Sequence, residues 1–260
     1  GIDVPTNSGK NRIDKINNGV FPFEVNDIEL KKKLKHCIKS GNLNATTEKK
    51  YYKNADIILI CINCDLYEKN DDAFIGLDLF IDGIDEVIKH ISEHTLIIIQ
   101  TTIPPGTCEK KVYPLILNSL SNRKLDPKSI YLAHSYERVM PGKNYLNSII
   151  NYWHVYAGIN LKSANKCEEF LKTIINTNEY PLTRLQSTTA SEIGKLLENS
   201  YRATNIAFIE EWSRFAEDVN VDLYEIIDAI RVRPSHSNIR QPGFGVGGYC
   251  LTKDPLFAKI

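Results

Sequence analysis

Two short predicted strands, 56–62 and 96–100, constrain the fold of this chain most strongly, because all their residues except Asp56 and Gln100 are apolar. A strand that is apolar at successive positions is covered on both faces, whereas a strand on a half-exposed sheet alternates apolar and polar residues. The stretch between the two runs, residues 77–91, has the apolar spacing of a helix. A strand, a helix and a second buried strand predict a parallel sheet with helices on both faces.

The alternation continues along the first two thirds of the chain. Shorter strands are predicted at residues 130–134 and 153–157. Further helices are predicted at residues 10–18, 27–38, 108–120 and 161–175. The fold class is therefore α/β, with a partial doubly wound, Rossmann-like parallel sheet.

After Pro181 the pattern changes to long helices. Residues 187–192 offer a helix start, and Gly194 is the single proline or glycine from there to residue 219. A helix of about 30 residues spans about 45 Å, a length suited to linking domains or subunits. A second helix is predicted at residues 223–231, ending before Arg233-Pro234. We therefore expect a sheet domain over residues 1–182 and a central helical domain over residues 183–260.

Composition excludes several classes of protein. The 260 residues are 42% apolar and 25% charged, enough to bury a large core, and they contain 32 basic and 32 acidic residues. Balanced charge predicts neither a nucleic-acid partner nor an anionic membrane partner. Six cysteines at irregular spacing, without an apolar run near 18 residues, predict a cytoplasmic protein. His90 and His94 lie four residues apart on a predicted helix, but no further ligands complete a metal site, so no metal is expected.

A glycine-rich loop brings one thiol to the start of a predicted helix. Four glycines occur within residues 243–248, and Cys250 follows two residues later. Glycines let the backbone approach a ligand closely, and a helix N-terminus favours the thiolate, which is the nucleophile. The alternative is a glycine loop followed by a buried, structural cysteine.

Three further segments place polar side chains where a ligand would meet them. Lys195 and Asn199 lie four residues apart on one face of the long helix. Thr102 follows the apolar run 96–100, and Glu137 follows the run 130–134, at the carboxyl ends of strands where doubly wound sheets bind ligands. Each has a simpler interpretation: a solvated Lys–Asn pair, a generic Pro-Pro-Gly turn, and a surface carboxylate paired with a neighbouring cation.

Together these segments resemble the nucleotide-sugar dehydrogenases, a family that includes UDP-glucose and UDP-N-acetylhexosamine 6-dehydrogenases. The loop of that family reads Gly-x-Gly-Gly-x-Cys-x-x-x-Asp. Every fixed place is filled in this chain, by Gly245, Gly247, Gly248, Cys250 and Asp254. The resemblance extends from residue 1 to residue 260 and also covers the Thr-Thr-Ile-Pro-Pro-Gly and Glu-Arg-Val-Met-Pro-Gly segments.

The resemblance implies an NAD-dependent enzyme that oxidises the C6 primary alcohol of a UDP-sugar to a uronate. Cys250 would hold the intermediate aldehyde as a thiohemiacetal and then a thioester. The implied catalytic residues are Cys250, Lys195, Asn199, Asp254, Glu137 and Thr102. The implied cofactor-binding residues are Asp3, Thr102 and Lys253. The implied substrate-binding residues are Glu137, Arg138, Lys195, Asn199, Gly245, Gly247 and Gly248.

Lys195 and Asn199 would stabilise oxyanions, Glu137 would serve hydrolysis as general base, and Asp254 would handle protons or orient water. In the resembled family the central helical domain forms a dimer, so a homodimer is implied. In this chain Tyr136 stands where the family has a proline before the glutamate, and Cys-Ile-Asn-Cys at residues 61–64 replaces Val-Pro-Thr-Pro. We therefore expect altered backbone or cofactor contacts at both places.

The chain opens at the acidic residue that meets the adenosine ribose, Asp3, so the family's first strand, Gly-x-Gly loop and helix are expected outside these residues. The family's carboxyl-terminal nucleotide domain is likewise expected beyond residue 260. Two alternatives stay open: a noncatalytic dimerisation or sugar-nucleotide-binding remnant, and a 3-hydroxyacid dehydrogenase, which needs no nucleophilic cysteine. The sequence does not rank UDP-glucose against the UDP-N-acetylhexosamines.

Overall fold

A computed structural model describes residues 1–69, 72–140 and 142–258 of the chain. It divides the chain into two compact units. The first unit comprises Gly1–Ile62, Asp78–Thr101 and Gly106–Ser191. The second unit comprises Asn63–Leu77, Thr102–Pro105 and Glu192–Ile260. Each unit therefore combines segments that are distant in sequence.

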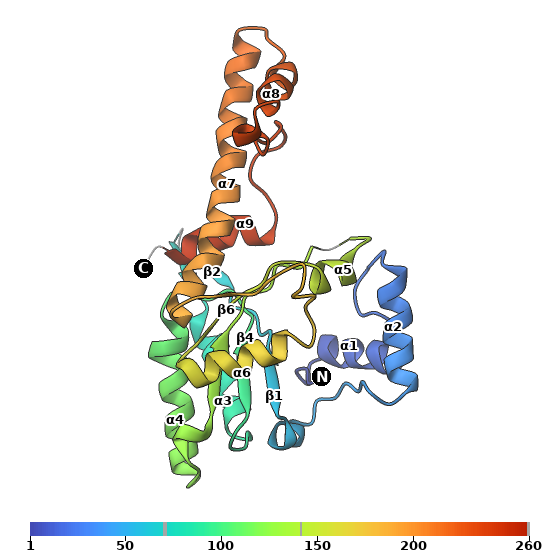
Figure 1. Cartoon of the computed structure of the whole chain (residues 1–260), viewed down its shortest axis with the longest axis vertical. Helices are drawn as coiled ribbons and strands as arrows, with labels where there is room; N and C mark the ends of the chain where they lie inside the picture. The colour runs from blue at the N-terminus through green and yellow to red at the C-terminus, as the bar shows by residue number, and fades with distance from the viewer. Residues whose placement is uncertain (70–71, 141, 259–260) are drawn as a thin grey trace. The chain divides into compact units, whose positions relative to one another are not determined.

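The first unit is built on a five-stranded sheet with the strand order β1-β4-β5-β6-β7 (Figure 1). Its strands are β1 (Ile57–Ile60), β4 (Leu96–Ile99), β5 (Tyr131–His134), β6 (Val155–Gly158) and β7 (Thr183–Arg184). The two apolar runs form β1 and β4, which pair in parallel with Ile58 opposite Ile97. β5 continues the parallel pairing, with Ile97 opposite Leu132. The predicted parallel α/β core is confirmed.

The sheet changes direction at β6, which the alternating pattern does not predict. β6 pairs antiparallel with β5, and β7 then runs parallel to β6. A parallel neighbour requires a crossover connection, commonly a helix packed on the sheet. In the described part of the connection from β5 to β6, residues 135–140 and 142–154, the single α-helix is the six-residue α5 (Tyr145–Ile150). The sheet is therefore mixed.

The core of the first unit lies on both faces of this sheet. On one face, Leu96 and Ile98 pack with residues of helix α6 (Leu161–Leu171), which lies across the strands in Figure 1. Ile97 and Ile99 point to the opposite face because side chains alternate along a strand. Both are at most 1% exposed. The central strand is thus buried on both sides, as its apolar run predicts.

The remaining helices of the first unit follow the predicted stretches closely. They are α1 (Asn7–Asn17), α2 (Ile28–Lys39), α3 (Leu77–Ile88), which begins one residue before the unit boundary, and α4 (Tyr113–Asn122). Short helical turns are η1 (Lys49–Asn54), the π-turn η2 (Cys108–Val112) and η3 (Pro127–Ser129). Asp27 caps α2 by accepting a hydrogen bond from the Leu30 amide at 2.9 Å. The prediction that His90 and His94 share a helix face is wrong, because α3 ends at Ile88 and His94 adopts a left-handed conformation.

The second unit contains the long helix α7 (Thr188–Asp218), which begins four residues before the unit boundary. The Ser187 hydroxyl accepts a hydrogen bond from the Ala190 amide at 3.1 Å, which confirms the predicted helix start. Helix α8 (Leu223–Arg231) has the predicted bounds and packs beside α7 in Figure 1. The unit also holds the hairpin β2 (Leu66–Lys69) and β3 (Asp72–Ile75), the turns η4 (Pro234–His236) and η5 (Asp254–Ala258), and helix α9 (Tyr249–Lys253). The hairpin is not among the predicted elements, because its strands are short and partly charged.

No helix of the described residues has both the length and the apolar character needed to cross a membrane.

Candidate active site

Cys250 is the second residue of α9 and is exposed to solvent. The loop before it uses left-handed backbone at Gly245, with φ of 80°, and at Gly248, with φ of 83°. A Cβ atom at Gly243 or Gly247 would meet nothing within 4 Å. Packing within the chain therefore does not require glycine at positions 243 and 247. Open space beside the backbone next to an accessible thiol is what close approach of a ligand needs.

Three of the predicted site residues form one buried cluster in the second unit. The Asn199 amide donates to Asp254 Oδ2 at 2.5 Å, and Lys253 Nζ lies 2.9 Å from Asp254 Oδ1. Lys253 Nζ also donates to the Cys64 carbonyl at 3.1 Å and lies 4.3 Å from the centre of the Phe257 ring. Asp254 is fully buried and Lys253 is 8% exposed. The cluster pairs the buried carboxylate with an ammonium and an amide, and it ties α9 to α7 and to the segment after β1.

Lys195 and Thr102 are two further predicted site residues of the second unit. Lys195 is half-buried and lies on the same face of α7 as Asn199, one turn away. Thr102 is also half-buried and lies in the short segment between β4 and η2 that belongs to this unit. An ammonium, an amide and a hydroxyl are the groups that stabilise a developing oxyanion.

The Cys-Ile-Asn-Cys segment contains two thiols of different exposure. Cys61 is exposed, and its Sγ donates to Gln100 Oε1 at 3.4 Å. Cys64 is 2% exposed, and burial raises its pKa to about 11. A thiol with so high a pKa stays protonated at neutral pH and is a poor nucleophile. The buried Cys64 is therefore structural, whereas the exposed Cys250 is the accessible thiol of the second unit.

Glu137 and Arg138 lie in the first unit, three and four residues after β5 ends. Glu137 Oε1 accepts from the Arg138 amide at 2.7 Å. The Arg138 guanidinium donates to the Tyr136 hydroxyl at 2.9 Å and to the Trp153 carbonyl at 2.8 Å, and it lies 5.1 Å from the centre of the Tyr136 ring. Tyr136, which stands in place of a proline, is 2% exposed. Arg138 thus holds this turn through the tyrosine and against the strand that follows.

Two buried histidines near this turn escaped the sequence reasoning. His134, the last residue of β5, is fully buried, with Nδ1 2.8 Å from Ser191 Oγ and Nε2 3.3 Å from the Thr101 carbonyl. His154 precedes β6, and burial lowers its pKa while the charge of Glu137 opposes that shift. The sequence signal that could have indicated the burial of His134 is its position at the end of an apolar run. His154 has no comparable signal.

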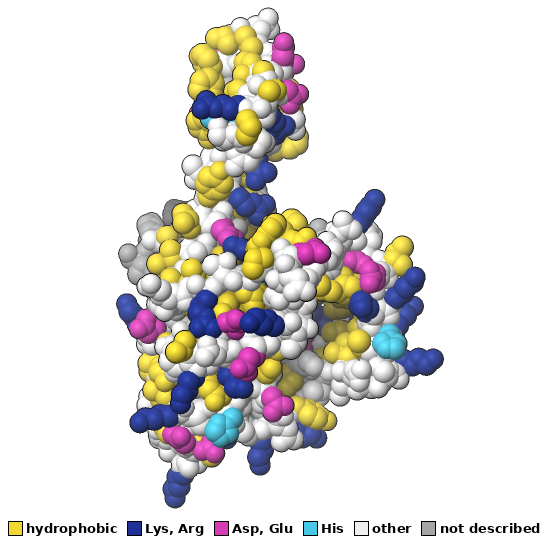
Figure 2. Space-filling view, in the orientation of Figure 1, with side chains coloured by type: hydrophobic (Ala, Val, Ile, Leu, Met, Phe, Trp, Pro, Cys, Tyr) yellow, Lys and Arg dark blue, Asp and Glu magenta, His cyan; other side chains and the backbone are white. Residues whose placement is uncertain are grey.

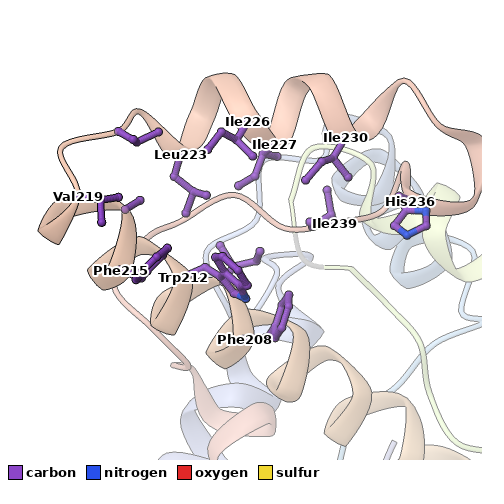
Figure 3. A pocket seen from close by; sticks show the side chains of 13 residues that line it. Phe208, Trp212, Phe215, Val219, Leu223, Ile226, Ile227, Ile230, His236 and Ile239 are labelled. Atoms are coloured by element: carbon purple, nitrogen blue, oxygen red, sulfur yellow. The ribbon is translucent and has the colours of Figure 1, made fainter.

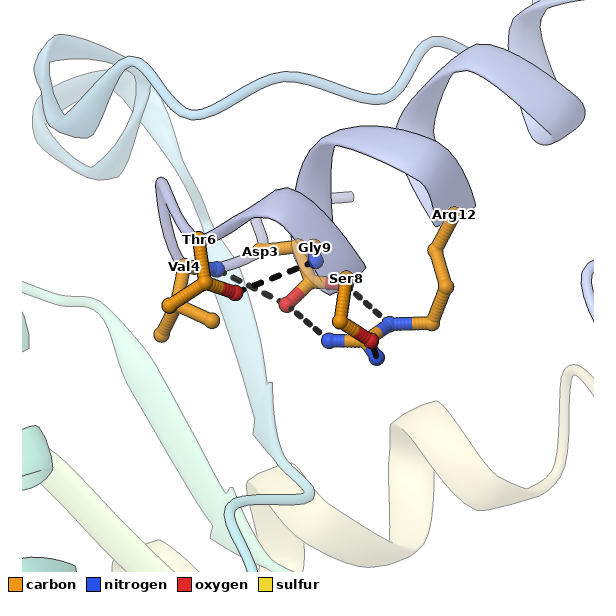
Figure 4. Close-up of polar contacts among 6 residues, drawn as sticks. All are labelled: Asp3, Val4, Thr6, Ser8, Gly9 and Arg12. Carbon is orange, nitrogen blue, oxygen red and sulfur yellow. Dashed lines mark hydrogen bonds and ion pairs between the residues drawn. The ribbon is translucent and has the colours of Figure 1, made fainter.

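Asp3, the candidate for the adenosine ribose, is held by Arg12 in the first unit (Figure 4). Arg12 donates from Nε to Asp3 Oδ2 at 2.6 Å and from Nη2 to Asp3 Oδ1 at 2.8 Å. The Val4 amide adds a third bond at 2.7 Å. The bond from Arg12 lowers the pKa of Asp3, so the carboxylate is ionised at neutral pH. An ionised, oriented acceptor with 29% of its side chain exposed suits a ribose hydroxyl.

No group of three or more His, Cys, Asp or Glu among the residues with a described position is arranged to hold a metal ion.

The chain is similar to curated proteins and to solved structures of nucleotide-sugar dehydrogenases. The UDP-N-acetyl-D-mannosamine dehydrogenase of Methanococcus vannielii is 33% identical over 264 residues, which is 99% of this chain and 54% of that protein. The solved structure of UDP-D-ManNAc dehydrogenase from Pyrococcus horikoshii is 32% identical, with a TM-score of 0.82 over 94% of this chain and 55% of that one. For the UDP-N-acetyl-mannosamine dehydrogenase of Staphylococcus aureus the identity is 27%, with a TM-score of 0.78 over 98% of this chain and 57% of that one. The chain spans about half the length of the relatives it matches.

Two stretches of the chain match two domains of one family. Residues 2–175 match the NAD binding domain of the UDP-glucose/GDP-mannose dehydrogenase family, and residues 189–259 match its central domain. Together the two matches include the sheet, the long helix and the cysteine loop. The chain belongs to the UDP-glucose/GDP-mannose dehydrogenase family.

Proposed function

We propose that this chain carries the catalytic core of an NAD-dependent nucleotide-sugar 6-dehydrogenase. The observation that supports it most is the exposed Cys250 in an open glycine loop, on a helix joined through Lys253 and Asp254 to Asn199. An accessible thiol beside a fixed array of polar groups is suited to covalent capture of an aldehyde. The reaction is oxidation of the C6 alcohol of a UDP-sugar to the uronate.

The relatives point to one class of sugar. The curated proteins from Methanococcus vannielii and Methanocaldococcus jannaschii, 33% and 32% identical, are both UDP-N-acetyl-D-mannosamine dehydrogenases. Each match covers 99% of this chain. UDP-N-acetyl-D-mannosamine is therefore the substrate that we propose first.

Asp3 fits the cofactor that the family uses, because its ionised carboxylate can accept a hydrogen bond from a ribose hydroxyl. The resemblance also implies that Lys253 binds the cofactor. In the structure its ammonium faces Asp254 and the Cys64 carbonyl. We therefore propose that Lys253 acts by holding α9 in place. NAD, when bound, accepts one hydride in each of the two oxidation steps.

The residues of the chain supply the steps around those hydride transfers. The Cys250 thiolate adds to the aldehyde carbon to form a thiohemiacetal, and loss of a hydride from that carbon leaves a thioester. Water attacks the thioester carbon, the C–S bond breaks, and uronate and the free thiol are released. The sum is one alcohol, one water and two NAD⁺ converted to one carboxylate, two NADH and three protons.

Specific side chains are proposed for the charges and protons of these steps. Lys195 and Asn199 stabilise the oxyanions, and Thr102 contacts the attacking water. Glu137 takes a proton from that water as the general base. Asp254 is fully buried, so we propose that it orients Asn199 through their 2.5 Å bond. Backbone around Gly247 leaves room for the sugar nucleotide.

Substitution of Cys250 by serine tests this proposal. Cys250→Ser is expected to slow uronate formation by about a thousandfold or more, because the alkoxide of serine is far less available than a thiolate. Binding of the UDP-sugar, measured by calorimetry, should stay unchanged. Cys37→Ser, at a partly exposed thiol of α2, is the matched control and should retain activity. A Cys250→Ser protein that releases uronate at the original rate would contradict the mechanism.

A second outcome distinguishes the alternative function. If the unsubstituted chain binds a UDP-sugar but forms no NADH with any member of a panel, the noncatalytic binding role gains support.

We also propose that the chain forms a homodimer through the α7–α8 groove. The groove is an apolar cavity of about 420 Å³ between the two helices and the residues that follow (Figure 3). Phe208, Trp212 and Phe215 of α7 line it and are each about half exposed. Hydrophobic side chains gather over this end of the second unit in Figure 2. An apolar patch of this kind marks an interaction surface, and a second copy offers a matching one.

A further inference from the structure

The β2–β3 hairpin closes at its base through a pair of residues in the second unit. The Gly76 amide donates to the Asp65 carbonyl at 2.7 Å. The ring of Tyr67 lies directly on Gly76, where a Cβ atom would come within 2.2 Å of Tyr67 Cε2. Tyr67 also stacks on Phe74 of the opposite strand, with ring centres 5.9 Å apart. Glycine at position 76 therefore leaves room for the Tyr67 ring, and the bond from its amide holds the backbone of Asp65.

Cys64 and Asp65, which precede the hairpin, contact the two ends of helix α9. The Tyr249 hydroxyl donates to Asp65 Oδ1, and Lys253 Nζ donates to the carbonyl of the preceding residue, Cys64, at 3.1 Å. Cys250 lies between Tyr249 and Lys253. Two successive residues thus hold the first and the last residue of the helix that carries the thiol.

α9 depends on such contacts because it is only five residues long. A helix this short does not persist in water by its own hydrogen bonds. The glycines before it have no neighbours at their Cβ positions, so the loop adds little restraint. Tyr249 is 58% exposed, so its ring gains little from packing. Within the helix, the Thr252 hydroxyl donates to the Gly248 carbonyl at 2.7 Å and Lys253 Nζ lies 5.3 Å from the centre of the Tyr249 ring. The hydroxyl bond to Asp65 adds a restraint on the first turn from outside the helix.

We propose that Asp65 is a positioning residue for Cys250, acting through the Tyr249 hydroxyl, with the Cys64 carbonyl fixing the other end of α9 through Lys253. The proposal rests on the proposed role of Cys250 as nucleophile. Placement of the reacting atom within a fraction of an ångström matters for such a step, because small misplacements remove much of the rate. The hairpin thus serves as the support of the cysteine helix.

A nitroxide label on Cys250 tests the restraint without any assay of activity. The label is attached after Cys37→Ser and Cys61→Ser remove the other thiols that are not buried. In the parent protein the label should give a slow component in its electron spin resonance spectrum. Asp65→Ala and Tyr249→Phe should each convert that component to a fast one, and the double variant should add nothing further.

Two further variants separate the hydrogen bond from general damage. Asp65→Asn keeps an acceptor oxygen but removes the charge, so it should keep the slow component. If the restraint depended on the charge of Asp65, this variant would lose the slow component. Gly76→Ala displaces the Tyr67 ring and should reproduce the fast component. Asp218→Ala, at an exposed aspartate at the end of α7, is the matched control and should change nothing. A slow component retained in both Asp65→Ala and Tyr249→Phe would overturn the proposal.

Kinetics complete the test and separate it from the proposed function. Asp65→Ala should lower kcat for uronate formation about tenfold with KM unchanged, since the substrate site is untouched. A mobile label with unchanged kcat would overturn the positioning role. If Cys250→Ser keeps full activity, the proposed function fails, and the label spectra still decide whether Asp65 holds Cys250.

Discussion

The central strands of the sheet and the groove-lining face of α7 are similarly apolar, but the chain covers them very differently. Ile97, Ile98 and Ile99 of β4 are at most 1% exposed. Phe208 and Phe215 of α7 are 53% and 56% exposed. The sheet finds its covering helices within the same unit, whereas the aromatic face of α7 is only half covered by α8. Each unit has a buried core of its own, and the exposed aromatic face of α7 is the surface that the proposed dimer would cover.

Truncation in the sheet is expected to have the largest effect. Ile98→Ala should lower the free energy of unfolding by about 3–4 kcal/mol, because Ile98 is fully buried against α6 and the cavity cannot refill. Urea denaturation at low protein concentration measures the change. Ile226→Ala, at a residue of α8 that is 40% exposed, is the matched control and should cost less than about 1 kcal/mol. Equal losses would contradict the contrast between the two regions.

Truncation in the groove should act on association instead. Trp212→Ala is expected to weaken the proposed dimer about thirtyfold, because the half-exposed Trp212 lines the groove and a second copy would bury it. Sedimentation equilibrium over a range of concentrations measures the dissociation constant. Trp153→Ala, at an equally exposed tryptophan of the first unit, should leave it unchanged. An unsubstituted chain that stays monomeric at every concentration would refute the dimer.

The smallest effect on stability is expected in the first unit, where Glu168 of α6 binds side chains of β6 and β7. Bonds from Lys172, Tyr156 and Arg184 lower the pKa of Glu168 to about 2, from an ordinary value of 4.5. A carboxylate with a lowered pKa stabilises the fold above its ordinary pKa, and this contribution is lost as the pH falls toward 2. Glu168→Gln should therefore be less stable than the parent at pH 7 and equal to it near pH 2.

Thermal unfolding between pH 7 and pH 2 tests the Glu168 prediction. Glu169→Gln is the control on the neighbouring residue of α6, which pairs with Lys166 on an exposed surface. A Glu168→Gln protein whose stability runs parallel to that of the parent at every pH would show that the network is not coupled to folding.

Much of the fold could be predicted because its signals are local. Continuous apolar runs gave β1 and β4, and the helix-start residues near Ser187 and the stop before Pro234 gave the bounds of α7 and α8. The antiparallel direction of β6 could not be predicted, because the pairing of strands depends on how the chain returns and not on the strand's own residues. The hairpin was missed for a related reason: its strands are too short to show a period.

The candidate site divides in the same way. The sequence by itself determined the family pattern, with Cys250 in a glycine loop and Lys195 and Asn199 one helical turn apart, because spacing along a helix or turn is a local property. Only the tertiary structure decided that Asp254 is buried against Asn199, that Arg138 holds Tyr136, and that Asp65 reaches Tyr249. These contacts join residues through side-chain packing, hydrogen bonding and burial. No pattern in one segment carries that information, because the free energy of each contact depends on both partners and on the water that they exclude.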